Sequence, residues 1–560
     1  MGGLEITVLL GASVLAGALL APRLRIATPL VFVLLGLLLG FVPSLRGIEL
    51  PPETVLLLFL PVMLFWESLT TSLRSIRRDL RGIVLMSTLL VVLTAFAVAG
   101  VAHLLGVPWE AALILGAAVA PPDATAVAAL GRSLPRRNFT LLKAESLTND
   151  GTALVVYAIA VGLATGGSYT PWTITGMVAL SYLGGIAAGI VTAIAAYLLM
   201  SRLRSALTIN IALLLTPFAA FLAAEIIHAS GVLAVVVAGL ISAYLGPRIS
   251  TAASRRQRDA VWPLGAFLLN GALFVLIGIE VQAVIRTIDL RDVGWLLLVT
   301  LAAWGVLLVV RFGFLWASAM LIRLLDRRPS QRLRRMSNRA RAVSTVAGFR
   351  GAVSLAIALS IPLGEGAGAV DGRNEVIFVT AGVILLTLLV QGPLLPAVVR
   401  WARLPADTAA EEELQLAERS ITGAALARIE EIAADVGISD EVRERLTRDY
   451  YEALELANAR VQARVDREIE ALDAMIDTRD PDADAEGELQ GAVVAVGTAV
   501  VSPLARNEEY TRLRLAVLDS KREVLVRLTR DGAVDDDVAR RIHTRLDVEE
   551  VRLRGPESLE

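Results

Sequence analysis

Residues 109–131 read WEAALILGAAVAPPDATAVAALG, an apolar run that is interrupted in its middle by Pro121-Pro122-Asp123. The run is long enough to cross a hydrocarbon layer of ~30 Å as a helix. Proline removes a backbone donor and clashes with the preceding turn, so the helix should break here. Broken backbone inside a membrane is tolerated only where protein encloses it or where it lines a cavity, and its freed carbonyls can bind a cation. This segment predicts a polar site within a membrane-spanning fold.

The composition of the whole chain also predicts a membrane protein. The chain has 560 residues, of which 55% are hydrophobic and only 19% charged, and its mean hydropathy is +0.64. So many apolar side chains require a surface that faces lipid. Apolar windows of about 20 residues recur about thirteen times before residue 403, which predicts an all-α polytopic fold. We place the spans at 4–22, 26–43, 53–72, 82–106, 109–131, 141–164, 173–200, 206–226, 229–246, 260–284, 293–324, 343–363 and 375–400.

The net charge of −2 conceals two parts of opposite charge. Residues 1–402 carry about 13 more basic than acidic side chains, whereas residues 403–560 carry about 15 more acidic than basic ones. We therefore expect a transmembrane domain over 1–402 and a cytoplasmic, mainly helical tail over 403–560. The acidic surplus of the tail is typical of a solvated face, and a regulatory role is the alternative.

Within the tail, a set of leucines at helical spacing predicts an amphipathic helix, and an Asp-Pro-rich segment predicts a break. The leucines are Leu515, Leu518, Leu525 and Leu528, and the break is at 480–484. The chain has no cysteine, which excludes disulfides and thiolate metal sites.

Arginine residues indicate the orientation of the spans, because short cytoplasmic loops are enriched in basic residues. One alternate set of loops holds nearly all of them, and the other holds only a few. The rich set contains Arg23 and Arg25; Arg74, Arg77, Arg78 and Arg81; Arg132, Arg136 and Arg137; Arg202 and Arg204; Arg248, Arg255, Arg256 and Arg258; and the cluster 327–341. The poor set contains Arg46, Arg286, Arg291 and Arg373. The N-terminus is therefore expected outside the cell membrane and the C-terminus in the cytoplasm.

Four ionisable residues in different spans should lie at nearly one depth. With a rise of ~1.5 Å per residue, Glu67, Asp123, Asp150 and Arg350 all fall near the middle of the layer. Charged groups at this depth are costly unless they are paired or hydrated, so they mark functional sites. The alternative is that each is an isolated structural ion pair or an end group that reaches water. Arg311 and Glu280 also lie in apolar runs, and Glu280 is close to a predicted outer end.

A second interruption is expected at Gly348-Phe349-Arg350-Gly351, in a span whose direction is opposite to that of 109–131. Two interrupted helices in opposed halves are typical of secondary transporters built from inverted repeats, with the substrate where the helices cross.

The span at 141–164 offers oxygen ligands on one helical face. Ser146, Asn149 and Asp150 are at positions i, i+3 and i+4, and Glu145 lies beside them. Hydroxyl, amide and carboxylate oxygens suit Na⁺ or Li⁺. Burial and mutual repulsion also favour protonation of such carboxylates, so cation and proton would compete for one site.

These motifs resemble the bacterial NhaP-type branch of the monovalent cation:proton antiporter family. The matching fragments are Ala120 to Ala124, Leu134 to Arg137, Ala144 to Ala153, Leu269 to Phe274 and Phe349 to Leu355. The resemblance covers essentially all of 1–402. It implies a homodimeric sodium/proton exchanger of the cell membrane, with thirteen spans, a dimerisation domain and a mobile core that alternates access and contributes to pH homeostasis.

The resemblance also implies roles for individual residues. Asp123, Ser146 and Asp150 would contact the ion together with the carbonyl of Pro122, and Glu67 would reach it through water. Asn149 would orient the site, and Glu145 would pair with Arg350 to hold the broken helices together. Asn rather than Asp before Asp150 implies electroneutral exchange. The chain departs from the family at Pro122, where many members have threonine, and at Lys143, where an acidic residue is usual.

Two other classes of protein remain as alternatives. Two buried aspartates could form the dyad of an intramembrane protease, and the same site could serve a cation channel or sensor. There is no Walker-type loop for an ATP-driven pump, and we expect no cofactor and no nucleic-acid partner.

Overall fold

A computed structural model describes residues 3–24, 26–42, 55–71, 73–123, 136–167, 169–249, 252–289, 291–325, 337–362 and 372–404, with scattered positions between 423 and 552. The chain divides into two units, 1–406 and 407–560. In the second unit the described positions are single helical residues or short helical runs, such as 454–456 and 458–463. The predicted leucine-rich helix and the break at 480–484 lie outside the described residues.

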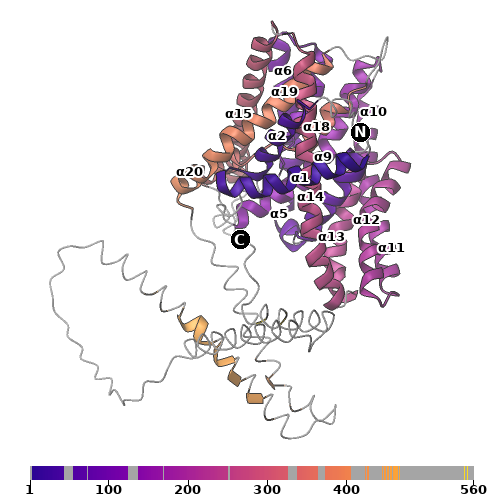
Figure 1. Cartoon of the computed structure of the whole chain (residues 1–560), viewed down its shortest axis with the longest axis vertical. Helices are drawn as coiled ribbons and strands as arrows, with labels where there is room; N and C mark the ends of the chain where they lie inside the picture. Colours follow the sequence, from indigo (N-terminus) through magenta and orange to yellow (C-terminus); the bar gives the residue numbers. More distant parts are fainter. Residues whose placement is uncertain are drawn as a thin grey trace, which may run out of the picture. The chain divides into compact units, whose positions relative to one another are not determined.

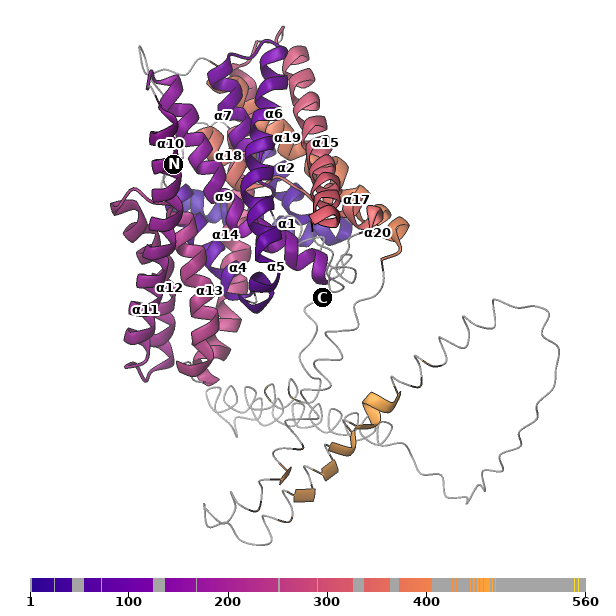
Figure 2. The same cartoon turned by 180° about the vertical axis from the view of Figure 1, so that it is seen from behind.

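The described part of the first unit consists of helices and turns without a strand (Figures 1 and 2). The helices are α1 (Gly3–Leu24), α2 (Thr28–Leu39), α4 (Leu60–Leu69), α5 (Leu73–Leu85), α6 (Val91–Leu104), α7 (Trp109–Val119), α9 (Arg136–Ala164), α10 (Pro171–Ala179), α11 (Gly185–Met200), α12 (Ala206–Ile226), α13 (Gly231–Ile249), α14 (Ala252–Thr287), α15 (Val293–Leu325), α17 (Asn338–Val346), α18 (Ala352–Leu359), α19 (Arg373–Leu386) and α20 (Gly392–Ala402). The all-α prediction is confirmed for these residues.

Short π-helical turns join several of these helices into longer ones. They lie at Met86–Leu90 between α5 and α6, at Leu180–Gly184 between α10 and α11, and at Thr387–Gln391 between α19 and α20. A fourth, Val55–Phe59, precedes α4. Such turns keep the backbone hydrogen-bonded along the helix, as an apolar environment requires.

Eight helices among the described residues are long and apolar enough to cross a membrane. They are Ile6–Leu24, Leu80–Leu104, Phe139–Ala164, Pro171–Met200, Ala206–Ile226, Gln257–Arg286, Val293–Leu321 and Arg373–Ala402. Four shorter apolar helices, Thr28–Leu39, Leu57–Leu69, Trp109–Val119 and Gly231–Gly246, also coincide with expected spans. The expected span 343–363 is divided into α17 and α18, and part of 109–131 lies beyond the described residues.

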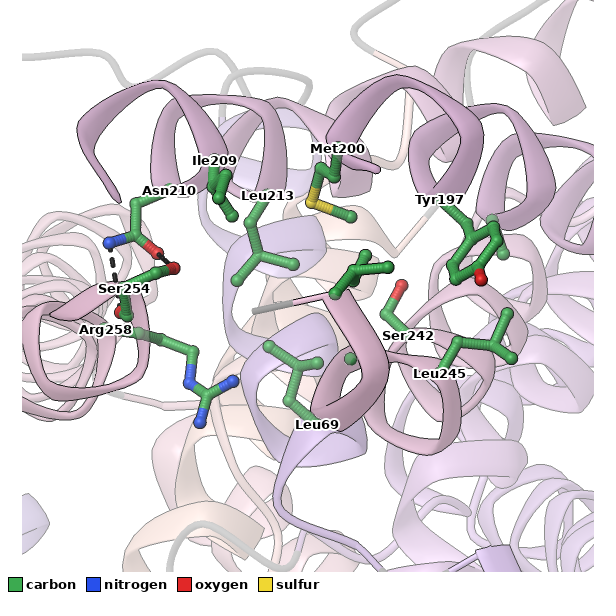
Figure 3. A pocket seen from close by; sticks show the side chains of 13 residues that line it. Leu69, Tyr197, Met200, Ile209, Asn210, Leu213, Ser242, Leu245, Ser254 and Arg258 are labelled. Atoms are coloured by element: carbon green, nitrogen blue, oxygen red, sulfur yellow. Dashed lines mark hydrogen bonds between the residues drawn. The ribbon is translucent and has the colours of Figure 1, made fainter. Parts of the chain in front are cut away.

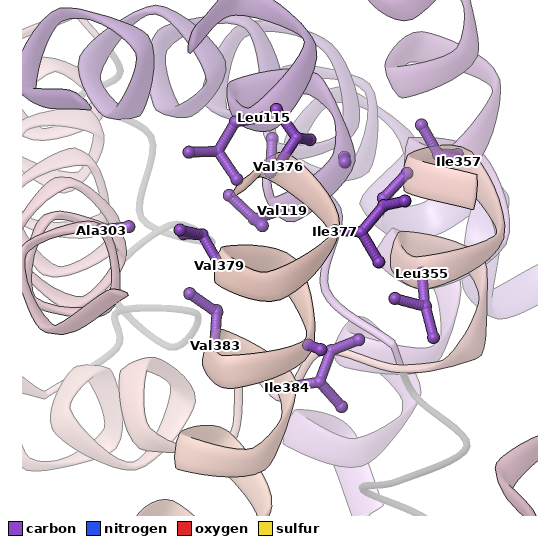
Figure 4. Close-up of a cluster of buried hydrophobic side chains, with 14 of the residues drawn as sticks. Leu115, Val119, Ala303, Leu355, Ile357, Val376, Ile377, Val379, Val383 and Ile384 are labelled. Carbon is purple, nitrogen blue, oxygen red and sulfur yellow. The ribbon is translucent and has the colours of Figure 1, made fainter. Parts of the chain in front are cut away.

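Two groups of buried apolar side chains organise the unit. The first, cluster A, joins α2, α6, α7, α14, α15, α18 and α19. Figure 4 shows its centre, where Val376, Ile377 and Val383 of α19 face α7, α15 and α18. The second, cluster B, joins α4, α11, α12 and α13. Large apolar side chains remain exposed on other helix faces, for example Trp172, Leu183 and Val309, as expected of a surface that contacts lipid.

Helix α9 belongs to both clusters. Ala144 and Leu147 pack in cluster B, whereas Leu142, Ala153 and Ala160 pack in cluster A. The predicted site residue Asp150 lies between Leu147 of cluster B and Ala153 of cluster A along the helix.

Glycine allows the backbones of α2 and α14 to touch. A Cβ atom at Gly36 would overlap with the carbonyl oxygen of Val275, and one at Gly278 would overlap with that of Val33. Small residues permit this close approach, which supplies van der Waals packing where lipid offers no hydrophobic drive.

We expect Gly278→Ala to lower the thermal stability of the detergent-solubilised protein, because overpacking costs about 1–3 kcal/mol. Gly305→Ala on α15 is the matched control, since a Cβ there meets no atom within 4 Å. The melting temperatures of both variants are measured by heating the samples and then quantifying the remaining folded protein by size-exclusion chromatography. Equal melting temperatures for the two variants would show that the α2–α14 contact does not limit stability.

Candidate functional site

The two interrupted segments meet through their backbones. Helix α7 ends at Val119, one residue before the Pro121-Pro122 pair that predicted the break. Helix α17 ends at Val346, and α18 begins only at Ala352, so the interruption predicted at 348–351 is confirmed. The backbone N–H of Asp123 donates to the carbonyl of Phe349 at 2.8 Å. This hydrogen bond joins the two breaks at one point.

The side chain of Arg350 satisfies the carbonyls that the breaks leave free. Its Nε donates to the carbonyl of Val119 at 2.8 Å and its Nη2 to that of Ala120 at 3.2 Å. Its Nη1 donates to the carbonyl of Gly348 at 2.5 Å. The guanidinium is only 3% exposed. A cation at the C-terminal end of a helix also interacts favourably with the helix dipole.

The expected pairing of Glu145 with Arg350 is wrong, because Arg311 of α15 is the partner of Glu145. Nη1 and Nη2 of Arg311 donate to Oε1 and Oε2 of Glu145 at 2.6 and 2.8 Å. Nε of Arg311 donates to the carbonyl of Ser344 at 3.0 Å. All three side-chain hydrogen bonds of Arg350 go to carbonyls, and a second cation, Arg311, pairs with the buried carboxylate. The signal in the sequence was the lone arginine in the apolar run of α15.

The structure brings the predicted acidic residues together. Asp150 on α9 is 5% exposed, whereas Asp123 and Glu67 are partly exposed. The carboxylates of Asp123 and Glu67 are close enough to interact electrostatically with that of Asp150. Ser146 is buried one turn before Asp150. A Cβ atom at residue 351 would overlap with the Asp123 carboxylate, so Gly351 gives that group its room.

Asn149 connects α9 to the broken segment. Its Nδ2 donates to the carbonyl of Pro122 at 2.7 Å. Its Oδ1 is buried and has no hydrogen-bond partner among the residues the structure describes. The Pro122 carbonyl retains a second lone pair that a cation can use. Asn149 is thus placed as a residue that positions Pro122.

Neutral oxygens lie on the same elements as the candidate acidic residues. No group of three acidic or histidine side chains with the geometry of a metal site is found within the described ranges. Neutral oxygens are present on the hydroxyl of Ser146 and the amide of Asn149, both on α9 with Asp150, and on the carbonyl of Pro122, which Asn149 contacts. Few charges and several neutral oxygens suit a monovalent ion better than a divalent one.

Lys143 bridges α9 and the end of α4. Its Nζ donates to Oγ1 of Thr70 at 2.7 Å. It also interacts electrostatically with Glu67. The departure from the family pattern thus places a positive charge beside one of the candidate acids.

We expect Arg311→Met to destabilise the protein by about 3–5 kcal/mol, because it leaves the buried Glu145 carboxylate unpaired. The double variant Arg311→Met with Glu145→Leu should recover much of this loss, because no buried charge then remains. The melting temperatures of the wild type, both single variants and the double variant in detergent, with Gly305→Ala as a folded reference, form a double-mutant cycle that measures the coupling. Independent, additive effects of the two substitutions would contradict the direct pairing.

Comparisons with known proteins identify the family of the chain. Residues 10–401 match the family model described as sodium/hydrogen exchanger, transmembrane. An uncharacterised Na⁺/H⁺ exchanger of Mycobacterium tuberculosis is 40% identical over 563 residues, which cover 100% of this chain and 97% of the relative. The Na⁺/H⁺ antiporter ApNhaP of Aphanothece halophytica is 32% identical over 69% of this chain and 71% of its own.

Among solved structures, the sodium proton antiporter MjNhaP1 of Methanocaldococcus jannaschii has the same fold. It aligns with a TM-score of 0.56 and 18% identity over 73% of this chain and 100% of its own. The fold, the crossing of two interrupted segments and the family match lead to one assignment. The chain belongs to the sodium/hydrogen exchanger family of monovalent cation:proton antiporters.

Proposed function

We propose that this antiporter exchanges Na⁺, or a similar monovalent cation, for H⁺ at a single site formed by Asp150 and Asp123. The observation that carries the proposal is the buried Asp150 carboxylate beside Asp123, at the point where the two broken segments are hydrogen-bonded. Ser146 and the Pro122 carbonyl would complete the shell of the ion, and Glu67 would contact it through water.

Competition between cation and proton provides the coupling. Burial disfavours two ionised carboxylates close together, so an empty site holds a proton. An arriving cation neutralises the carboxylates and releases the proton, and a proton can expel the cation in turn. Asn149 carries no charge, which favours one cation for one proton and hence electroneutral exchange.

The two clusters would be the bodies whose relative movement alternates access. Cluster B and cluster A are joined through α9, which carries Asp150. We propose that the helices of cluster A move relative to α4 and α11–α13, so that the site opens to one side at a time. The full arrangement comprises thirteen spans in a homodimer of the cell membrane, with the N-terminus outside and the tail of 403–560 in the cytoplasm.

Asp150→Ala tests the proposal directly. In everted vesicles that contain the wild-type protein, NaCl should dequench a pH-sensitive dye, and in the variant the response should fall at least about tenfold, to background, because the shared carboxylate is gone. Asp289→Ala is the control, since Asp289 is an exposed carboxylate in a loop. Exchange in Asp150→Ala near the wild-type rate, at equal amounts of inserted protein, would refute the site.

Lys143→Ala tests the electrostatics beside Glu67. Removal of a positive charge near the site should lower the Na⁺ concentration for half-maximal exchange, about threefold to tenfold. Lys143→Arg keeps the charge and should stay close to wild type. A half-maximal concentration that is unchanged or higher in Lys143→Ala would show that this charge does not oppose cation entry.

A further inference from the structure

A cavity separate from the ion site lies where the ends of α4, α11, α12, α13 and α14 converge (Figure 3). The space between its walls, open solvent included, is about 460 Å³. Most of its lining is apolar, including Leu69, Tyr197, Met200, Leu213, Leu245 and Ile249. None of these residues takes part in the site around Asp150.

One hydroxyl in this cavity has no partner. Ser242 is 8% exposed, and its Oγ makes no hydrogen bond within the part of the chain that the structure describes. A helical serine ordinarily bonds the carbonyl four residues earlier, as Ser68 does with Leu64 at 2.7 Å. A buried hydroxyl without a hydrogen bond costs free energy, so a ligand that offers Ser242 a hydrogen-bond acceptor would be stabilised in this cavity.

The opposite end of the cavity is polar and basic. Nε of Arg258 donates to Asp259 at 2.9 Å, and its two terminal amino groups make no hydrogen bond to the residues described in the structure. Asn210 donates to the Ser254 carbonyl at 3.2 Å, and Ser254 Oγ donates to Asn210 Oδ1 at 3.1 Å. Figure 3 shows this network beside Arg258. The network fixes α12 against α14 and so positions the arginine.

The surrounding charge favours an anion. Arg202 and Arg204 are exposed in the turn between α11 and α12, and Arg248, Arg255 and Arg256 are close to Arg258 in the sequence. In the proposed orientation all five helix ends face the cytoplasm, where the membrane leaflet carries anionic lipids. Ser242 is seven residues before the end of α13, or about 10 Å deeper along the helix axis.

We propose that this cavity binds one anionic phospholipid of the cytoplasmic leaflet. The phosphate pairs with Arg258, an acyl chain packs among the apolar side chains, and Ser242 donates a hydrogen bond to an ester carbonyl. Only the choice of leaflet rests on the proposed orientation. The occupant is a lipid rather than free phosphate, because most of the side chains that line the cavity are apolar.

Native mass spectrometry of the full-length protein in neutral detergent tests the proposal with dioleoyl phosphatidylglycerol as the probe. The wild type should retain one such lipid per chain in preference to dioleoyl phosphatidylcholine. Arg258→Gln and Ser242→Leu should each reduce the bound fraction at subsaturating lipid about fivefold, through loss of a charge-assisted contact and through filling of the cavity. Ser242→Ala removes only the hydroxyl and should lower the bound fraction about twofold. This variant provides the test if Ser242→Leu does not fold.

Arg400→Gln is the matched control, because Arg400 is exposed near the end of α20 and does not line the cavity. It should bind the lipid as the wild type does. Wild-type retention in Arg258→Gln and in both Ser242 variants, an equal loss in Arg400→Gln, or displacement of the lipid by excess glycerol 3-phosphate would each overturn the proposal. The readout involves no ion gradient, so its failure is separable from failure of exchange.

Discussion

The arrangement depends on one constraint: backbone groups freed inside an apolar layer must find partners. Each break in a helix releases carbonyls and N–H groups that water cannot reach. Arg350 takes up the carbonyls of Val119, Ala120 and Gly348, and Asp123 N–H takes up that of Phe349. Each broken segment is thus satisfied by the other. This mutual dependence fixes where the Asp123 carboxylate stands relative to α9.

The same constraint explains the second buried cation. The three side-chain hydrogen bonds of Arg350 all go to carbonyls, and none goes to the carboxylate of Glu145. Arg311 makes a bidentate pair with Glu145 and also reaches the Ser344 carbonyl. The pair therefore ties α9 to α15 and α17. The buried charges therefore form two sets: the ion pair of Arg311 and Glu145, which holds helices together, and the acidic side chains close to Asp150.

The sequence predicted the helices and both breaks because these follow from local rules. Apolar length defines a span, and Pro121-Pro122 and the Gly348–Gly351 segment disturb helical geometry wherever they occur. Counting residues along helices also brought Asp123, Asp150 and Glu67 to one level. The choice between Arg311 and Arg350 as the partner of Glu145 could not be made this way. It depends on side-chain direction and on competition for donors, and the hydrogen bond from Lys143 to Thr70 is equally a matter of tertiary contact.

Helix α9 has 29 residues and thus a length of about 43 Å. Its buried side chains alternate between the two clusters along this length: Leu142 packs in cluster A, Ala144 and Leu147 in cluster B, and Ala153 and Ala160 in cluster A again. The helix thus lies along the boundary between the two clusters rather than inside one of them. Any displacement of one cluster against the other would therefore act directly on the helix that carries Asp150.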